Sequence, residues 1–300
     1  IVEATIHGNV SQVKTIIENL KRKTELNEND SENIPLNSNS ANNKQQDSYA
    51  KQIPKVCKNQ QSSVSASDDL FRSRINARSS SGMTAAMWAA RKGYTDILLE
   101  LIINGADVIE AQANGISTLM FAVESGHKKC VNILLDNGAN ALDRTPDNDS
   151  ALLCACSFGY DEIAIALIER GASALEALVV SCVQGKDSTV LSLVESDLVD
   201  INAVWDELMV SPLAGACVTG HFSTVELLLS LGADPNVNVD VEYGSTPLML
   251  AVHMGNIEVV QCMLFAGADV NAVAPPESEC ARANGENITA LEIARINNHE

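Results

Sequence analysis

Apolar residues recur along the chain in one arrangement that is repeated several times. In GSTPLMLAVHMG, which begins at Gly244, a polar start is followed by small and apolar residues and then by glycine. Related stretches begin at Gly82 (GMTAAMWAARKG) and at Gly115 (GISTLMFAVESG). Each copy is followed by a second apolar segment, such as IEVVQCMLFAGAD after Asn256. This repetition indicates stacked copies of one small unit.

The glycine that closes each copy gives the length of the unit. These glycines are Gly93, Gly126, Gly159, Gly185, Gly220 and Gly255, at intervals of 33, 33, 26, 35 and 35 residues. A second series, GA or GAD, has nearly the same spacing and includes Gly105, Gly138, Gly171, Gly232 and Gly267. A period near 33 residues is typical of stacked helical repeats.

Within a unit the pattern predicts two helices. Thr246 and Pro247 suit a helix start, because the hydroxyl can cap free amide groups and proline fits the first turn. Gly255 suits the end of that helix, where a positive φ costs glycine little. The apolar positions of 257–264 then form the stripe of a second helix, which Gly267 closes.

The repeated unit resembles the ankyrin repeat. The sequence GADVNA at 267–272 matches the end of the ankyrin consensus, and Ser211-Pro212-Leu213 and Gly220-His221 match its first helix in part. The resemblance covers 1–20 and about 75–300. It implies an all-α repeat solenoid of stacked ankyrin repeats, each a helix-turn-helix with a β-hairpin or loop called a finger.

The period divides the chain into about six complete and two partial repeats. A partial repeat is expected at 1–20, and the main array at 75–300. The expected units are about 75–110, 111–143, 144–171, 172–203, 204–238 and 239–272, followed by a partial repeat at 273–300.

One unit is predicted to lack its finger. Ala172-Ser173-Ala174 passes directly into the helical sequence LEAL, which explains the short 26-residue interval. Conversely, the fingers around 206–209 and 240–243 are about two residues longer than usual, and the loop 273–287 is longer still. The missing finger predicts two binding segments, 75–171 and 200–300, separated by a shallow or bent repeat.

The segment 21–74 breaks the period. Its Asn-, Ser- and Gln-rich composition, as in ENDSENIPLNSNSANNKQQD, has too few large apolar residues to offset the entropy of ordering. The sequence therefore predicts a disordered insertion at 21–74, whose deletion leaves the melting temperature of the stack nearly unchanged.

The net charge of the chain indicates which class of partner it can bind. The formal net charge is −19, and the residues outside 21–78 hold 10 of the 20 basic but 32 of the 39 acidic side chains. This excess argues against nucleic acid, whose recognition depends on positive charge, and favours a basic protein partner. Aromatic residues make up only 4% of the chain, so its core must consist of Ala, Val, Leu and Ile.

Cysteine usage and hydropathy bear on location. The eight cysteines form no CxxC pair, and we interpret them as small reduced core residues of a cytoplasmic or nuclear protein. No apolar run has the roughly 20 residues that a membrane helix requires. Because Ile1 stands within a repeat-like pattern, we interpret the sequence as part of a longer protein.

Motifs for catalysis, cofactors and metals are missing from the sequence. It contains no HExxH, no GxSxG and no cysteine pair with zinc spacing, and Gly185-Lys186 lacks the upstream glycine of a phosphate loop. His127 and His221 follow unit-closing glycines, where ankyrin repeats keep a structural histidine. We therefore expect a non-enzymatic protein without cofactor or metal.

The resemblance implies a scaffold or adaptor that binds a protein partner and is itself a monomer. The alternatives are a regulatory or targeting domain of a larger enzyme, such as a kinase or a ubiquitin ligase, and a structural spacer. Partner contacts are expected around the fingers and at the ends of the first helices. The candidate positions are Met83, Arg91, Lys92, Asn114, Ile116, Glu124, Asp147, Asp149, Trp205, Tyr243, His253 and Met254.

Overall fold

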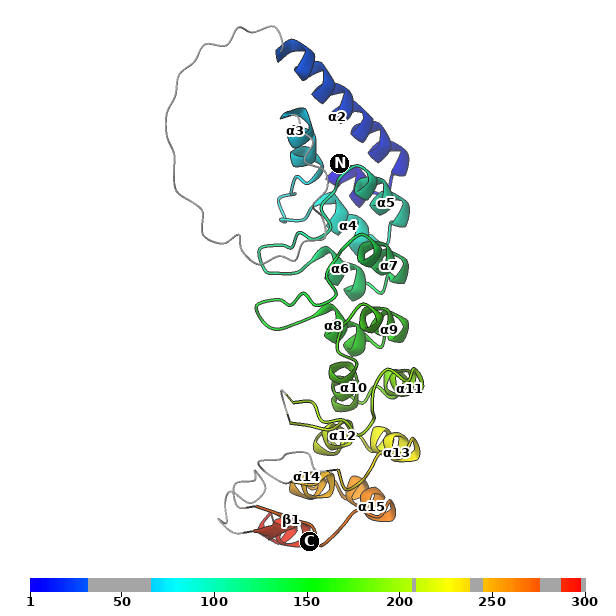
Figure 1. The fold of residues 1–300 in the computed structure, drawn as a ribbon, viewed down its shortest axis with the longest axis vertical. Helices are drawn as coiled ribbons and strands as arrows, with labels where there is room; N and C mark the ends of the chain where they lie inside the picture. Colours follow the sequence, from blue (N-terminus) through cyan, green and yellow to red (C-terminus); the bar gives the residue numbers. More distant parts are fainter. Residues whose placement is uncertain (32–65, 207–208, 238–244, 276–286, 298–300) are drawn as a thin grey trace, which may run out of the picture. The chain divides into compact units, whose positions relative to one another are not determined.

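The computed structural model describes residues 1–31, 66–206, 209–237, 245–275 and 287–297. The chain divides into two units, Ile1–Val108 and Ile109–Glu300. Within each unit most of the described helices are arranged as pairs, in agreement with the predicted all-α repeat solenoid (Figure 1).

The first unit contains five helices. They are α1 (Val2–Ile6), α2 (Val10–Ser31), α3 (Ala66–Ile75), α4 (Ala85–Lys92) and α5 (Thr95–Ile103). The pair α1/α2 contacts the pair α4/α5, helix by helix, and α3 packs against α2. The prediction of disorder at 21–74 is therefore wrong at both of its ends, which are helical. Residues 32–65 lie outside the described part of the chain.

The second unit contains the remaining helices and two short strands. They are α6 (Thr118–Glu124), α7 (Lys128–Asp136), α8 (Ala151–Phe158), α9 (Asp161–Glu169), α10 (Ala174–Val183), α11 (Asp187–Glu195), α12 (Pro212–Thr219), α13 (Phe222–Ser230), α14 (Pro247–His253), α15 (Ile257–Phe265), β1 (Val273–Ala274), β2 (Ile288–Thr289) and α16 (Ala290–Ile296).

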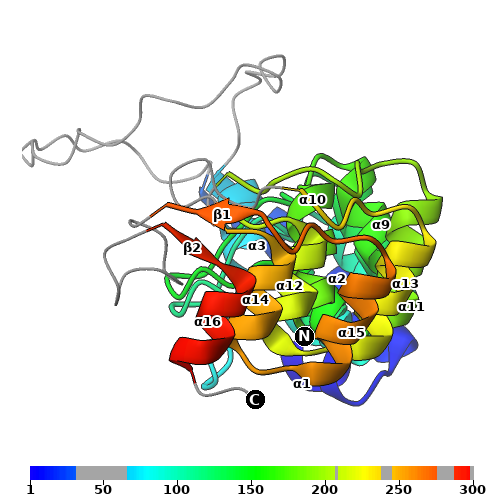
Figure 2. The ribbon, with the colours of Figure 1, turned by 90° about the horizontal axis from the view of Figure 1, so that it is seen from below.

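Helices of the second unit form two layers. The even-numbered helices α6 to α16 contact one another in sequence and make the inner layer, next to the fingers. The odd-numbered helices α7 to α15 make the outer layer. Figure 2 shows the β1–β2 finger on the α14 and α16 side, away from α15. Fingers and inner helices therefore share one face of this unit.

Each inner helix begins at a capping hydroxyl. The side-chain oxygen of Thr246 accepts a hydrogen bond from the Met249 amide at 3.3 Å, as expected from the sequence. Ser150 caps α8 in the same way through the Leu153 amide, at 3.1 Å. Gly159 ends α8 with a φ of 71°, a left-handed conformation that favours glycine. The capping residues therefore fix where each inner helix starts.

Polar contacts link successive repeats. His221 Nε2 lies 3.0 Å from the carbonyl oxygen of Val183, which confirms its predicted structural role. His127 stands at the same position before α7. Along the bases of the fingers, Asn236 Oδ1 accepts a hydrogen bond from the Asp269 amide at 2.7 Å. These contacts hold the repeats in register.

One repeat lacks a finger, as predicted. Four of the other fingers are marked by backbone pairing, at Ala111–Ser117, Arg144–Ser150, Trp205–Val210 and between β1 and β2. In contrast, α9 is followed after three residues by Ser173, which caps α10. The chain therefore passes from an outer helix to the next inner helix with no room for a hairpin.

Candidate functional site

A cavity of about 330 Å³ opens on the face formed by fingers and inner helices. It lies between α6, α8 and the finger 144–150. The lining combines apolar side chains with hydroxyls and two carboxylates, contributed by Ile116, Met120, Glu124, Thr145, Asp149, Ser150, Leu153, Cys154, Ser157 and Phe158. This volume is at the lower end of the range for ligand pockets, about 300 to 1,000 Å³.

Regular structure positions the lining residues. Met120 and Glu124 are four residues apart on α6, so both side chains lie on the same side of that helix. Leu153 and Ser157 have the same spacing on α8. Each of the two inner helices therefore lines the cavity with side chains from two successive turns.

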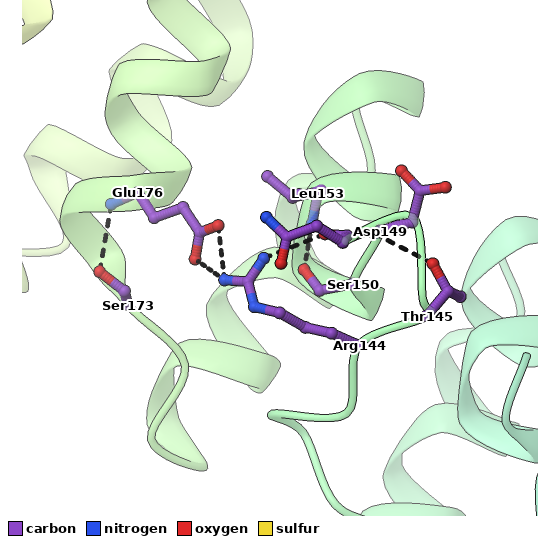
Figure 3. Close-up of polar contacts among 8 residues, drawn as sticks. Arg144, Thr145, Asp149, Ser150, Leu153, Ser173 and Glu176 are labelled. Carbon is purple, nitrogen blue, oxygen red and sulfur yellow. Dashed lines mark hydrogen bonds and ion pairs between the residues drawn. The ribbon is translucent and has the colours of Figure 1, made fainter. Parts of the chain in front are cut away.

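The finger 144–150 is held by an ion pair with the next repeat. Arg144 Nη2 lies 2.7 Å from both carboxylate oxygens of Glu176 on α10 (Figure 3). The Glu176 side chain is only 6% exposed, whereas that of Arg144 is 33% exposed. Arg144 Nη1 also donates to the carbonyl of Asn148 at 3.2 Å. Arg144 thus joins this finger to the fingerless repeat.

Within the finger, hydrogen bonds close the turn. The Thr145 amide donates to the Asp149 carbonyl at 2.8 Å, and the Asp149 amide donates to Thr145 Oγ1 at 3.1 Å. Figure 3 shows the Asp149 carboxylate pointing away from the Arg144 guanidinium. Asp149 therefore keeps its charge available to the cavity.

The two carboxylates of the cavity have no cationic partner among the residues that the structure describes. Neither Glu124 nor Asp149 forms an ion pair with any residue that the structure describes, and both are exposed. Burial, and after it the charges of Glu124 and Asp149, together raise the pKa of the Cys154 thiol to about 11. The field of both carboxylates therefore reaches the floor of the cavity.

Thiol chemistry is disfavoured in the described part of the chain. Its six cysteines are free, and burial raises the pKa of every one of their thiols. A catalytic cysteine needs the opposite shift, because the thiolate is the nucleophile. In the described part of the chain, no group of three His, Cys, Asp or Glu side chains is placed to hold a metal ion.

None of the helices that the structure describes has both the length and the apolar character needed to cross a bilayer.

Comparison with known proteins agrees with the paired helices and fingers. A family model of ankyrin repeats, in three copies, matches residues 86–177 and again 178–274. The chain belongs to the ankyrin repeat family. No match is found among curated proteins.

Solved structures of ankyrin repeat domains resemble this one. The domain of human ASB11 is 27% identical, with a TM-score of 0.53 over 71% of this chain and 92% of that one. For Bcl-3, described as a unique member of the IkappaB protein family, the identity is 25%, the TM-score 0.59 and the coverage 71% and 95%. A domain from Acinetobacter baumannii is 26% identical, with a TM-score of 0.51 and coverage of 61% and 98%.

Three of the predicted contact positions meet in the cavity of this ankyrin array. Ile116, Glu124 and Asp149 all line it. Asp147 is exposed on the same finger, and Asn114 is exposed on the preceding one. The structure thus brings these three positions together, and their contact with a partner stays a prediction.

Other predicted positions of the second unit are dispersed. Met254 is 51% exposed at the end of α14. The adjacent His253 is half-buried, and its Nδ1 lies 3.3 Å from the side-chain nitrogen of Asn297. Trp205 is half-buried at the start of its finger. Tyr243 lies outside the described residues.

In the first unit, Arg91 and Lys92 are exposed in the last turn of α4. The Arg91 guanidinium lies 5.8 Å from the centre of the Trp88 ring. Met83 differs from them, because its side chain is only 3% exposed. Met83 is therefore a core residue, and the prediction that it contacts a partner is corrected.

Four apolar lining residues were missed by the sequence reasoning. They are Met120, Leu153, Cys154 and Phe158. For Leu153, Cys154 and Phe158 the signal was present in ALLCACSF, where the residues turned away from the core are as apolar as those facing it. An inner helix that is apolar on both faces has a second apolar surface, which is available to contact a binding partner.

Proposed function

We propose that this chain is a protein-binding module, a scaffold or adaptor, whose contact surface is the face of fingers and inner helices. Ankyrin repeats generally mediate protein–protein interaction. The observation that carries the proposal here is the cavity between α6, α8 and the finger 144–150, where apolar side chains lie beside two carboxylates that form no ion pair with a described residue. Apolar lining supplies binding energy, and the carboxylates supply orientation.

Chemistry by the chain itself is not part of the proposal. Ankyrin repeat domains are typically non-catalytic, and the raised thiol pKa values of the described cysteines disfavour a thiolate nucleophile. We place the protein in the cytoplasm or nucleus, where thiols stay reduced, because the six described cysteines are free. In this account the protein acts by bringing its partner to other molecules.

Selection from a randomised peptide library tests the proposal. Peptides are selected on the parent protein, and their affinity is then measured for two variants that carry the same substitution, Phe158→Ser and Phe265→Ser. Phe158 ends an inner helix and is 55% exposed, whereas Phe265 ends the outer helix α15 and is 93% exposed.

The proposal predicts that Phe158→Ser weakens binding of the selected peptides by about tenfold or more, as expected for an interface anchor. Phe265→Ser should leave the affinity unchanged. Peptides that lose affinity only with Phe265→Ser would place the binding surface on the outer helices and contradict the proposal.

A further inference from the structure

The floor and the rim of the cavity differ in chemistry. Met120, Leu153 and Cys154 give an apolar floor between α6 and α8, and Phe158 is more than half exposed at its edge. Glu124 is the last residue of α6, and Asp149 directly precedes the cap of α8. The cavity therefore suits a side chain that is apolar along its length and cationic at its end.

The basic side chain of the finger 144–150 already forms an ion pair within the protein. Arg144 is the only basic residue in 144–150, and its guanidinium is paired with the nearly buried Glu176. It therefore does not neutralise the two carboxylates at the rim. Because both carboxylates also act on the Cys154 thiol, their negative potential extends over the apolar floor.

We propose that this cavity binds an arginine side chain of a partner peptide, with the guanidinium beside Glu124 and Asp149 and the methylenes against Leu153 and Phe158. This inference rests on the proposed function and names the chemistry of the partner. A cavity of about 330 Å³ fits one such side chain with its neighbouring backbone.

Arginine fits these groups better than lysine does. The planar guanidinium has five N–H donors, so it can serve carboxylates from two different elements at once. It is also more weakly hydrated than an ammonium group and stacks readily on aromatic rings, as Phe158 allows. Lysine offers a compact and strongly hydrated charge, which loses more on entering an apolar cavity.

The test uses the full chain labelled with ¹³C in its methionine methyl groups. The probe is the blocked peptide acetyl-Gly-Arg-Gly-amide, and its neutral match carries citrulline in place of arginine. Met120 lines the cavity, while Met249 and Met263 are fully buried elsewhere and report on the fold. The Met120 signal is assigned with Met120→Leu.

We expect the arginine peptide to shift the Met120 signal in a saturable way, with citrulline binding at least about tenfold more weakly, since hydrogen bonds to charged groups contribute more than neutral ones. Glu124→Gln with Asp149→Asn should reduce arginine binding to the citrulline level. Asp147→Asn removes one charge from the same finger outside the cavity lining and should have little effect. In all of these variants Met249 and Met263 should keep their positions.

Equal shifts with arginine and citrulline, or an unmoved Met120 signal, would overturn the arginine inference. An equal loss with Asp147→Asn would do the same, because it would show a diffuse charge effect instead of a defined site. Library peptides that bind through Phe158 but are insensitive to Glu124 and Asp149 would leave the proposed function intact while refuting arginine recognition. Library peptides insensitive to Phe158 would refute the proposed function itself.

Discussion

Arg144 and Glu176 join the finger 144–150 to the following repeat, which has no finger between α9 and α10. Two contacts of 2.7 Å connect the Arg144 guanidinium with a carboxylate that is only 6% exposed, on a helix of the following repeat. The Glu176 amide is in turn bonded to Ser173 Oγ at 3.2 Å, at the start of α10 (Figure 3). The finger is thereby held beside the gap that the missing hairpin leaves.

Removing the charge of Glu176 should destabilise the array. We expect Glu176→Gln to lower the free energy of unfolding by about 2 kcal/mol, less than the cost for a fully buried pair because Arg144 keeps access to water. The matched control is Glu162→Gln, which disrupts the exposed ion pair with Lys128 and should cost less than about 1 kcal/mol. Urea denaturation followed by circular dichroism measures both. Equal losses would contradict a special role for the Arg144–Glu176 pair.

Glycine at position 126 should be required for the packing of two repeats. Its φ is +71°, and an added Cβ would lie 2.9 Å from Cζ of Tyr160. Gly138 has a φ of +92° with open space around its Cβ direction. Both Gly→Ala changes incur left-handed strain of about 1–2 kcal/mol, and only Gly126→Ala adds a steric conflict.

A double-mutant cycle separates these two causes. Tyr160→Ser should recover part of the stability lost by Gly126→Ala and nothing of that lost by Gly138→Ala. Thermal unfolding of the single and double variants gives the coupling. No coupling between positions 126 and 160 would show that the strain of the backbone alone sets the cost.

The reactivity of Cys154 should report the two carboxylates of the cavity. Burial, Glu124 and Asp149 together hold its thiol pKa at about 11, so alkylation is slow at neutral pH and accelerates as pH rises toward that value. Replacing both carboxylates by amides should lower the pKa and speed alkylation at pH 9. Cys130, whose thiol pKa is raised to about 11 by burial alone, is the internal control. A parallel increase at Cys130 would indicate loosening of the fold.

The cap of the last described helix should be sensitive to pH. The backbone amide and then the side chain of Thr289 lower the pKa of Glu292 by hydrogen bonding to its carboxylate. Because the folded pKa is lowered, the stabilisation is present above the unfolded pKa and is lost as pH falls through the folded value. Thr289→Ala keeps the backbone bond, so it should raise the pKa of Glu292 only part of the way to its ordinary value. A ¹³C titration of the glutamate carboxyls measures this, and an unchanged pKa would show that the hydroxyl contributes nothing.

Much of the architecture was predictable because each repeat contains its own signals. The hydroxyl of Thr246 and the left-handed Gly220 act locally, so the start and end of a helix follow from a few neighbouring residues. The missing finger at Ala172 was visible for the same reason, as a deletion within one period. The local character of these signals explains why they survive without knowledge of the fold.

Features that depend on distant residues were not predictable. Glu176 stands in an apolar helix, and nothing nearby in sequence points to Arg144, which is 32 residues away. The helical ends of the 21–74 segment belong to α2 and α3, which contact each other, and its polar composition gives no sign of this contact. Met83 looked available for binding, whereas the fold buries it. The cavity itself needs α6, α8 and a finger to be brought together.

The most direct test of the central claim is photo-crosslinking at positions 158 and 265. The photoreactive residue p-benzoylphenylalanine replaces Phe158 in one variant and Phe265 in the other, and each is irradiated with the peptide selected on the parent protein. Binding on the face of fingers and inner helices predicts crosslinks from position 158 and none from position 265. Crosslinks from position 265 alone would contradict it.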